Sequence, residues 1–300
     1  ISFFKGVYRM KEFKGKTVVV TGAASGIGYA LAERFAQEKM NVVLADIEQD
    51  ALDAAVTKIS NLDVEAVGIA VDVMDKNSVQ SLTKQSIDAF GNIHILCNNA
   101  GVAPPAIDEA IWDHDMSDWD WVMGVNFYGV LYGIQSFLPH MIAHQEEGHV
   151  LNTVSMAGIL GLEGSYGVSK FAALSLSEGL FQSLKKINSK IGASALCPGF
   201  VATNLTDSQR NRPEHLASEK KSNFLLKQLA ASVLKRGKKP DEIAARVIEA
   251  IKTNSFYILP HPIYDEMVKE RYERILARTE PETVDIKMAW LGSLLRREEY

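Results

Sequence analysis

The sequence predicts an α/β fold, a doubly wound parallel sheet in a single domain with a C-terminal helical extension. Short apolar runs rich in β-branched residues alternate along the chain with amphipathic segments of helical period. A glycine-rich turn joins the first apolar run to the first amphipathic segment. Continuous apolar strands between such helices are typical of a parallel sheet covered on both faces. Right-handed crossovers then wind the helices onto the two sides.

Each predicted element follows from its own run of residues, taken in chain order. TVVVTG at 17–22 is short, β-branched and ended by glycine, as expected of a strand, whereas IGYALAERFAQEK at 27–39 carries apolar residues at helical spacing. By the same criteria, further strands are predicted at 41–46, 64–73, 93–101, 149–155, 191–200 and 255–260. Further helices are predicted at 49–60, 78–91, 117–144, 166–187 and 240–253.

Three segments fall outside this alternation. Residues 1–13 are predicted to be a leader or a cloning remnant, and residues 261–300 a charged helical extension. Within the main domain, 14–260, the segment 201–239 is rich in Arg, Asn, Lys and Ser and is expected to be an irregular insertion with solvated basic side chains. A long irregular loop in a compact domain is usually functional or disordered, so this one is a candidate lid over a substrate.

Composition argues against several classes of function. The 300 residues carry a net charge of −5, which argues against a nucleic-acid surface. No run of about 18 apolar residues predicts a membrane span, and the first residues do not resemble a signal peptide. Cys97, Cys197 and the histidines lack metal-ligand spacing, so no metal is expected. We expect both cysteines to be buried free thiols rather than a disulfide. Free thiols suit a reducing compartment, so the cytoplasm is the expected location.

The turn VTGAASGIG places Gly22, Gly26 and Gly28 where the first strand meets the first helix. Glycine allows close backbone approach to a pyrophosphate, and a helix N-terminus presents free N–H groups to it, although a tight turn alone is the simpler interpretation. Asp46 ends the second predicted strand, where a carboxylate can accept ribose hydroxyl protons and repel a 2′-phosphate. No basic residue lies beside it in sequence, so NAD is favoured over NADP. Capping of the next helix is the alternative role for Asp46.

Four motifs occur in order along this pattern: T-G-x-x-x-G-I-G at 21–28, N-N-A-G at 98–101, Y-x-x-x-K at 166–170 and P-G at 198–199. Together they make the chain resemble the short-chain dehydrogenase/reductases, which have a Rossmann fold, over residues 14–260. A less specific likeness links it to bacterial members that oxidise the benzylic alcohol of lignin-derived aryl ethers.

The resemblance implies a set of cofactor-binding residues, to which Tyr166 and Lys170 also belong. The others are Gly22, Ser25, Gly26, Ile27 and Gly28 for the pyrophosphate; Asp46 and Ile47 for the adenosine ribose; Asp72 and Val73 for adenine; Asn99, Ala100 and Gly101 for the floor of the cleft; and Pro198, Gly199, Val201 and Thr203 for the nicotinamide end.

Tyr166 and Lys170 are spaced four apart, which puts both side chains on one helix face. A solvated helix surface is the ordinary outcome for such a pair. A nearby ammonium would instead lower the pKa of a phenol from its usual ~10 toward the working pH, as acid–base catalysis requires. Tyr166 is therefore the predicted general acid and base. The resemblance implies that Asn126 holds a water linking Lys170 to solvent.

The third catalytic residue has two candidates. Ser155 precedes Met156-Ala157-Gly158, as a substrate-binding serine of the family would, but lies eleven residues before Tyr166, two fewer than the family's usual gap. Strict counting would select Thr153. Ser155 is preferred because a loop, here ILGLEGS, shortens more readily than a strand residue shifts.

The predicted function is NAD-dependent interconversion of a secondary alcohol and a ketone by hydride transfer. The alternatives are an NADPH-dependent ketone reductase and an NAD-binding sensor or scaffold without turnover. The expected partners are a small-molecule alcohol or ketone, with no nucleic acid and no membrane. The two long helices are more apolar than one sheet face requires. Because members of the family that the chain resembles pair their subunits through these helices, the resemblance implies a homodimer or homotetramer.

Overall fold

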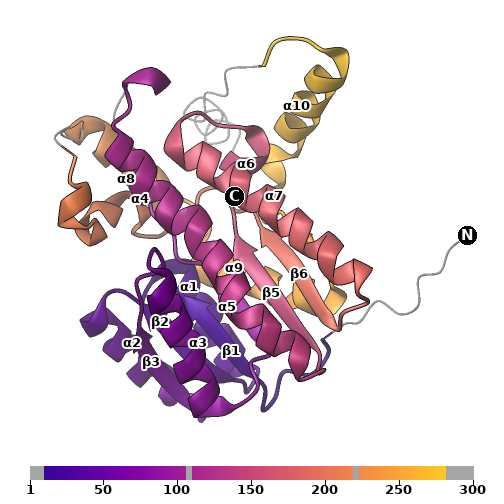
Figure 1. Ribbon diagram of the computed structural model, residues 1–300. Coiled ribbons are helices and arrows are strands. Elements are labelled where there is room, and N and C mark those ends of the chain that lie inside the picture. The colour runs from indigo at the N-terminus through magenta and orange to yellow at the C-terminus, as the bar shows by residue number, and fades with distance from the viewer. Residues whose placement is uncertain (1–9, 106–109, 219–222, 282–300) are drawn as a thin grey trace, which may run out of the picture.

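Parallel strands form the centre of the structure, a computed structural model that describes residues 10–105, 110–218 and 223–281. The strands are β1 (Thr17–Thr21), β2 (Asn41–Asp46), β3 (Ala66–Ala70), β4 (Ile95–Asn98), β5 (Gly148–Thr153), β6 (Ile191–Leu196) and β7 (Tyr257–Ile258). All pair in parallel, in the order β3-β2-β1-β4-β5-β6-β7. The order reverses direction between β1 and β4, so the sheet is doubly wound as predicted (Figure 1).

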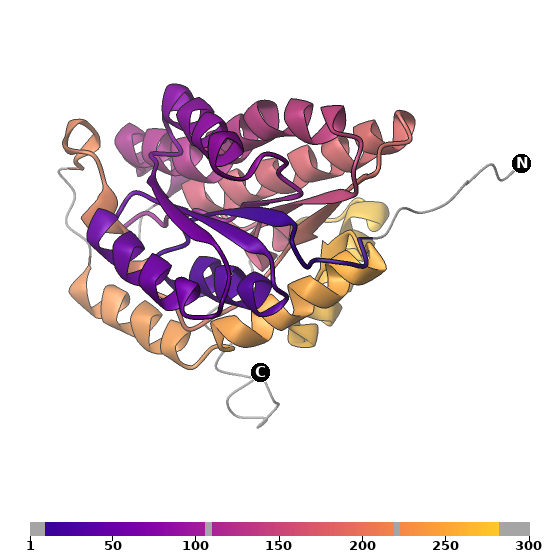
Figure 2. The same ribbon diagram turned by 90° about the horizontal axis from the view of Figure 1, so that it is seen from below.

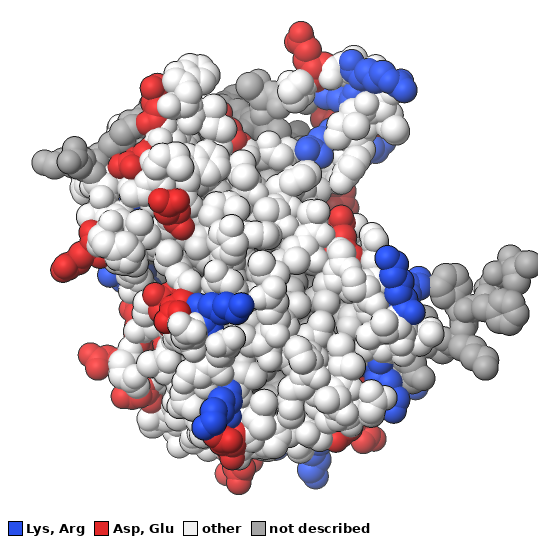
Figure 3. All heavy atoms as spheres, in the orientation of Figure 1, with Lys and Arg blue, Asp and Glu red and all other residues white. Residues whose placement is uncertain are grey.

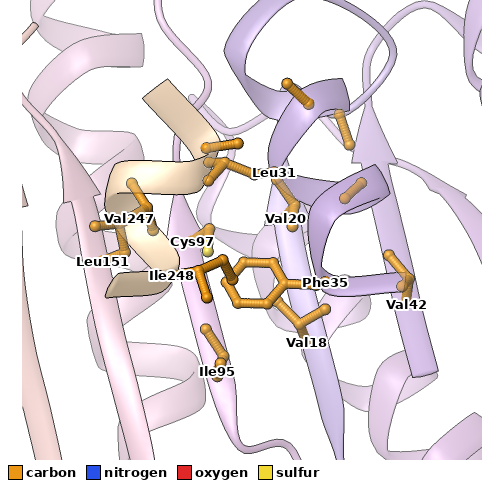
Figure 4. Close-up of a cluster of buried hydrophobic side chains, with 14 of the residues drawn as sticks. Val18, Val20, Leu31, Phe35, Val42, Ile95, Cys97, Leu151, Val247 and Ile248 are labelled. Atoms are coloured by element: carbon orange, nitrogen blue, oxygen red, sulfur yellow. The ribbon is translucent and has the colours of Figure 1, made fainter. Parts of the chain in front are cut away.

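Helices cover both faces of this sheet, which separates them as a middle layer in Figure 2. One face carries α1 (Gly26–Gln37), α2 (Gln49–Ser60) and α9 (Pro240–Thr253), and the other carries α3 (Lys76–Phe90), α5 (Gly129–Ala143) and α7 (Gly164–Lys186). In β1, Val18 and Val20 pack into the first core with Phe35 and Ile248 (Figure 4), while Val19 packs into the second. Because successive strand side chains point to opposite faces, a strand covered on both sides has to be apolar throughout.

The predicted helix at 117–144 is interrupted. It consists of α4 (Met116–Met123), a π-helical turn η2 (Gly124–Tyr128) and α5. The segment ILGLEGS is also only partly a loop, since its first two residues belong to α6 (Met156–Leu160). Several predicted strands are longer than the observed ones, because the residues after β4 and β6 leave the sheet and turn across its edge.

The expectation of an irregular insertion at 201–239 is wrong for the described part of that segment. It contains the 3-10 helices η3 (Leu205–Asn211) and η4 (Glu214–Leu216), and then α8 (Phe224–Lys235). Asn223 caps α8 by accepting hydrogen bonds from the backbone N–H groups of Leu225 and Leu226. Residues 219–222 lie outside the described residues. A short 3-10 turn, η1 (Ile111–Asp113), precedes α4.

The ends of the described chain pack against the main domain. Met10 and Phe13 are buried in the first core, so the packed domain includes residues 10–13, which were predicted to belong to a leader. After β7, the chain forms η5 (Pro262–Tyr264) and the helix α10 (Asp265–Ala277), consistent with a helical extension, and Tyr264 is buried in a third core cluster. Residues 1–9 and 282–300, which belong to the same predictions, lie outside the described residues.

Both cysteines, Cys97 and Cys197, are buried and unpaired, as predicted. Within the described ranges, no helix combines the length and hydropathy that crossing a membrane requires. Over the same residues, no three or more His, Cys, Asp and Glu side chains lie together so that they could hold a metal ion.

His149 is buried in β5, far from water in the sheet. Its Nε2 lies 2.7 Å from the Ser194 hydroxyl oxygen, and that hydroxyl donates its proton to the carbonyl of Ser255 at 2.6 Å. The Ser194 oxygen is therefore left to accept from an Nε2–H of neutral imidazole. Burial lowers the pKa of His149 to about 3.

We expect His149 to make the fold acid-sensitive. Because the unfolded chain takes up the proton near the ordinary pKa of ~6.5, the free energy of unfolding should fall as the pH drops from that value toward the folded pKa of about 3. The contribution of one such group is at most ~1.4 kcal/mol per pH unit. Denaturant unfolding of wild type and of His149→Gln at several pH values between ~4 and ~7 measures it. Equal pH slopes in the two proteins would contradict this assignment.

Candidate functional site

A cleft lies at the carboxyl edge of the sheet, where α/β proteins of this topology bind ligands. The structure brings almost all of the predicted site residues to its lining. They are Gly22, Ser25, Gly26, Ile27, Asp46, Ile47, Asp72, Val73, Asn99, Ala100, Gly101, Ser155, Tyr166, Lys170, Pro198, Gly199, Val201 and Thr203. The two exceptions, Gly28 and Asn126, lie behind this lining.

The glycine turn is a tight packing arrangement between the end of β1 and the start of α1. Gly22 has a φ of +66°, a conformation that side chains disfavour. A Cβ at Gly28 would lie 2.0 Å from the carbonyl oxygen of Gly22 and 2.6 Å from the side-chain Nδ2 of Asn99. Helix α1 can therefore start directly at the sheet edge, with its free N–H groups at the cleft and no acidic residue in its first turn.

Thr21 fastens this turn to the end of β4. Its hydroxyl donates to the carbonyl of Cys97 at 3.3 Å and accepts from the backbone N–H groups of Asn99 and Ala100 at 3.0 and 3.1 Å. The side-chain amide of Asn99 donates to the carbonyl of Thr21 at 3.0 Å. The floor of the cleft is thus fixed by hydrogen bonds across the two central strands.

Asp46 lies at the end of β2 and holds the glycine turn from the other side. Its carboxylate accepts the backbone N–H of Ala24 at 2.9 Å and that of Glu48 at 3.1 Å. Glu48 is the residue that precedes α2, and Asp46 bonds that residue rather than the first turn of the helix. The capping alternative therefore does not describe its contacts, and the carboxylate also faces the cleft.

Tyr166 and Lys170 lie on the first turns of α7 at the other end of the cleft lining. Lys170 is 3% exposed, its Nζ donates to the carbonyl of Thr153 at 3.0 Å, and it lies 5.8 Å from the centroid of the Tyr166 ring. Spacing alone predicted that these side chains share a helix face, and they do.

The predicted lowering of the Tyr166 pKa by Lys170 is wrong for the protein by itself. Burial raises the pKa of the Tyr166 phenol, and a hydrogen bond with Ser155 opposes that shift without cancelling it. Burial also lowers the pKa of Lys170 to about 8. Loss of water thus disfavours the charged form of each group more than their mutual proximity favours it.

The geometry separates the two candidates for the third catalytic residue. The Ser155 hydroxyl donates to the carbonyl of Pro198 at 3.4 Å and accepts the backbone N–H of Ala157 at 3.1 Å, which caps α6. It also lies close enough to the Tyr166 phenol to act on the pKa of that group. The Thr153 hydroxyl instead donates to Asn99 at 3.1 Å. Ser155 therefore faces the phenol, whereas Thr153 faces the floor. The short gap to Tyr166 is filled by α6, a tight loop at 161–163 and the start of α7, and φ is positive both at Gly161 and at Gly164, the first residue of α7.

Asn126 is fully buried in the π-helical turn η2. Its amide donates to the Val102 carbonyl at 3.0 Å and to the Ser169 hydroxyl at 3.1 Å, and its oxygen accepts the Val102 N–H at 2.9 Å. Both amide hydrogens are engaged, so a water bound here would use the second lone pair of Oδ1 or the main-chain carbonyl. The Asn126 oxygen and the Lys170 amine both lie 3.4 Å from the position of a Cβ built on Gly101.

Residues 203–213, which we call the strap, cross the cleft and supply lining that the sequence did not reveal. Its hydroxyl and amide groups bond the chain after β4, where Ser208 accepts the N–H of Ala103 and Gln209 donates to the Ala103 carbonyl, both at 3.3 Å. Lining residues missed by sequence reasoning include Glu48, Trp121, Leu205, Ser208, Arg210, Asn211, Pro213 and Leu234. Trp112 is 83% exposed and is not among the residues that line the cleft.

The arginines of the strap are ion-paired, which corrects the expectation that they are solvated. Arg210 forms a bidentate pair with Glu48, at 2.6 Å from its Nη2 and 3.3 Å from its Nε. Arg212 pairs with the buried Asp118 of α4 and its guanidinium lies 5.2 Å from the centroid of Trp121. The basic composition of this segment predicted a surface loop. Its acidic partners, Glu48 and Asp118, are distant along the chain, and only the fold brings them close to the arginines.

The C-terminal extension supports the opposite side of the cleft. His261 accepts the N–H of Gly199 at its Nδ1 at 3.1 Å and lies 3.0 Å from the carbonyl of Phe200 through its Nε2. Burial lowers the pKa of His261 to about 4, in keeping with a neutral ring that accepts at one nitrogen and donates at the other. The turn after β6 is thereby held by residues that follow β7.

Comparison with known proteins agrees with this arrangement. The family model described as short chain dehydrogenase matches residues 16–214. A CLA biosynthesis dehydrogenase/reductase of Lactiplantibacillus plantarum is 34% identical over 91% of this chain and 97% of its own length. The C alpha-dehydrogenase of a Sphingobium species is 30% identical over 94% of this chain and 95% of its own.

A crystal structure of a short chain dehydrogenase/reductase from Burkholderia phymatum, in complex with NAD, superposes with a TM-score of 0.87. It is 38% identical, and the match covers 91% of this chain and 99% of the other. The chain therefore belongs to the short chain dehydrogenase family of oxidoreductases. The relation to the Sphingobium enzyme agrees with the likeness to bacterial aryl-ether alcohol dehydrogenases drawn from the sequence.

Proposed function

We propose that this enzyme interconverts a secondary alcohol and a ketone by NAD-dependent hydride transfer, with Tyr166 as general acid and base. The convergence of Ser155, Tyr166 and Lys170 in one cleft with the glycine turn carries the proposal. A hydroxyl, a phenol and an amine that line one cleft can bind a substrate oxygen and exchange its proton.

The residues of the cleft fit a dinucleotide. The close approach at Gly28 leaves the N-terminus of α1 open to a pyrophosphate, and Asp46 ends β2 where an adenosine ribose would be held. The carboxylate of Asp46 favours NAD, because it would repel a 2′-phosphate. The similarity to the NAD complex from Burkholderia phymatum supports the same cofactor.

At the reacting end, Ser155 would donate a hydrogen bond to the substrate oxygen and Tyr166 would move the proton. Because burial raises the pKa of the phenol, its resting form is neutral, which suits donation to a ketone. Acceptance from an alcohol requires a positive charge to lower that pKa, and protonated Lys170 is the group of this chain placed to supply it. When bound, the nicotinamide would give or take the hydride at the substrate carbon.

The exposed faces of α5 and α7 carry few charges, which supports assembly into a homodimer or homotetramer. The exposed residues over the first turns of α7 are Val168, Phe171, Ser175 and Gly179, which are all uncharged. Figure 3 shows few charged side chains over the middle of this face, where α5 and α7 run in Figure 1. Gly179 costs the helix about 1 kcal/mol relative to alanine, yet no described atom lies within 4 Å of the position of its Cβ. Close approach of a second copy would explain that glycine.

Replacing Tyr166 with Phe removes the proton-transfer group while keeping the ring. We expect turnover to fall by about 10²–10⁴-fold, with NADH affinity changed little. Wild type and variant should be assayed at 340 nm with NAD(H) and NADP(H), starting with benzylic alcohols and aryl ketones because of the aryl-ether likeness. A Tyr166→Phe variant that keeps both its NADH binding and its effect on downstream partners would favour a dinucleotide sensor over an enzyme. Stronger binding of NADPH than of NADH by wild type would favour an NADPH-dependent reductase.

Ser155→Ala and Thr153→Ala distinguish the two candidates for the substrate-binding hydroxyl. Ser155→Ala should lower kcat by about 10²-fold, as loss of one oxygen-binding donor does, with NADH affinity largely kept. Thr153→Ala removes a bond to Asn99, so it should weaken NADH binding more than it lowers kcat. The reverse ranking of the two kcat values would assign the role to Thr153.

A charge at Gly179 tests the proposed subunit interface. Gly179→Lys improves helix propensity, so the monomer should not lose stability. In sedimentation velocity runs, wild type should sediment as an oligomer and the Gly179→Lys variant as a monomer. Gln80→Lys, on the exposed side of α3, is the matched control and should leave the assembly intact. A wild-type chain that sediments as a monomer would refute the interface.

A further inference from the structure

The strap brings a guanidinium to the end of the cleft that Asp46 borders. Two of the described lining residues are basic: Lys170 at the reacting end and Arg210 here. The hydrogen bond with Glu48 is the largest cause that raises the pKa of Arg210, and the charge of Asp46 adds to it, so Arg210 is within electrostatic reach of Asp46. A cation beside the end of β2 is the group that a ribose 2′-phosphate would bind.

Glu48 already occupies this guanidinium. Its Oε1 accepts from the Nη2 of Arg210 at 2.6 Å and from the amide of Asn211 at 2.8 Å, and its Oε2 accepts from the Nε of Arg210 at 3.3 Å. The Nη1 of Arg210 donates to the carbonyl of Asp207 at 2.9 Å. Three nitrogens of the guanidinium group are thus engaged, and the partner that takes two of them is Glu48.

We propose that Glu48 is a specificity-determining residue, which excludes NADP by withholding Arg210 from a 2′-phosphate. The inference rests on the proposed function, in which this end of the cleft holds the adenosine ribose. Asp46 repels a 2′-phosphate directly, whereas Glu48 removes the one cation, among the described lining residues at this end, that could offset that repulsion. The pair is about a third exposed, with side-chain exposures of 34% for Arg210 and 30% for Glu48, so a ligand phosphate could reach the guanidinium once Glu48 is neutral.

A binding cycle on Glu48 and Arg210 tests this inference without any substrate. The dissociation constants of NADH and NADPH are measured by cofactor fluorescence for wild type, Glu48→Gln, Arg210→Gln and the double variant. Glu48→Gln should shift the NADPH-to-NADH affinity ratio toward NADPH by about tenfold, the effect of one released charge-assisted hydrogen bond. In the Arg210→Gln background, the same substitution should shift the ratio by less than about threefold, which makes the two effects non-additive.

Lys227→Gln serves as the matched control. Lys227 forms a more exposed ion pair with Asp207 of the strap at 3.0 Å, so its loss removes one strap-bound charge away from Glu48 and should leave the ratio unchanged. Added salt should reduce the gain of Glu48→Gln, because the pair is partly solvated.

The outcomes separate this inference from the proposed function. Equal shifts in the two backgrounds would mean that the negative charge of Glu48 acts by itself, and no shift in either would mean that Glu48 does not discriminate. Both results overturn the inference while NADH binding by wild type leaves the proposed function intact. Failure of wild type to bind NADH would overturn both.

Discussion

The contact between Gly28 and the Gly22 carbonyl is the constraint on which the cleft depends. It brings α1 so close to the end of β1 that even a methyl group on residue 28 would overlap the turn. Asn99 packs into the same space from the end of β4, so the helix terminus and the floor of the cleft are fixed by one contact. The remaining site residues are carried by neighbouring strands of the same sheet and inherit their positions from it.

Electrostatics divide the cleft into two unlike ends. At one end, burial raises the pKa of the Tyr166 phenol, which stays neutral, and lowers the pKa of Lys170 to about 8, so its ammonium gives up a proton more readily than a solvated one. At the other, Asp46 is held by backbone N–H groups and Glu48 by an arginine. A ligand with one end rich in hydroxyl donors and another that reacts by proton exchange meets complementary surroundings at both.

Local pattern was sufficient for much of the fold. The helices at 49–60 and 240–253 were predicted with the bounds that α2 and α9 have, because their apolar spacing is regular and they end at turn residues. The motif residues converged as predicted because parallel strands end at a common edge. The π-helical turn at Asn126 was not predictable, since its sequence keeps a helical pattern and the insertion depends on packing around a buried amide.

Long-range contacts explain what the sequence did not reveal. Arg210 and Glu48 are 162 positions apart, and nothing in either neighbourhood indicates the other. Composition marked the strap as a charged loop, whereas its partners in the fold determine that it is helical and bound at several points. The direction of the Tyr166 pKa shift likewise depends on burial. The spacing of Tyr166 and Lys170 along a helix gives no information about burial.

One continuous segment contacts the cleft at two separate points. Thr203 lies beside Gly26 at the glycine turn, and seven residues later Arg210 reaches the loop after β2. A segment anchored at both points transmits displacement, because moving one anchor strains the other. Efforts to widen substrate range by redesigning the strap would therefore also alter how firmly the dinucleotide is retained, and the two properties would have to be optimised jointly.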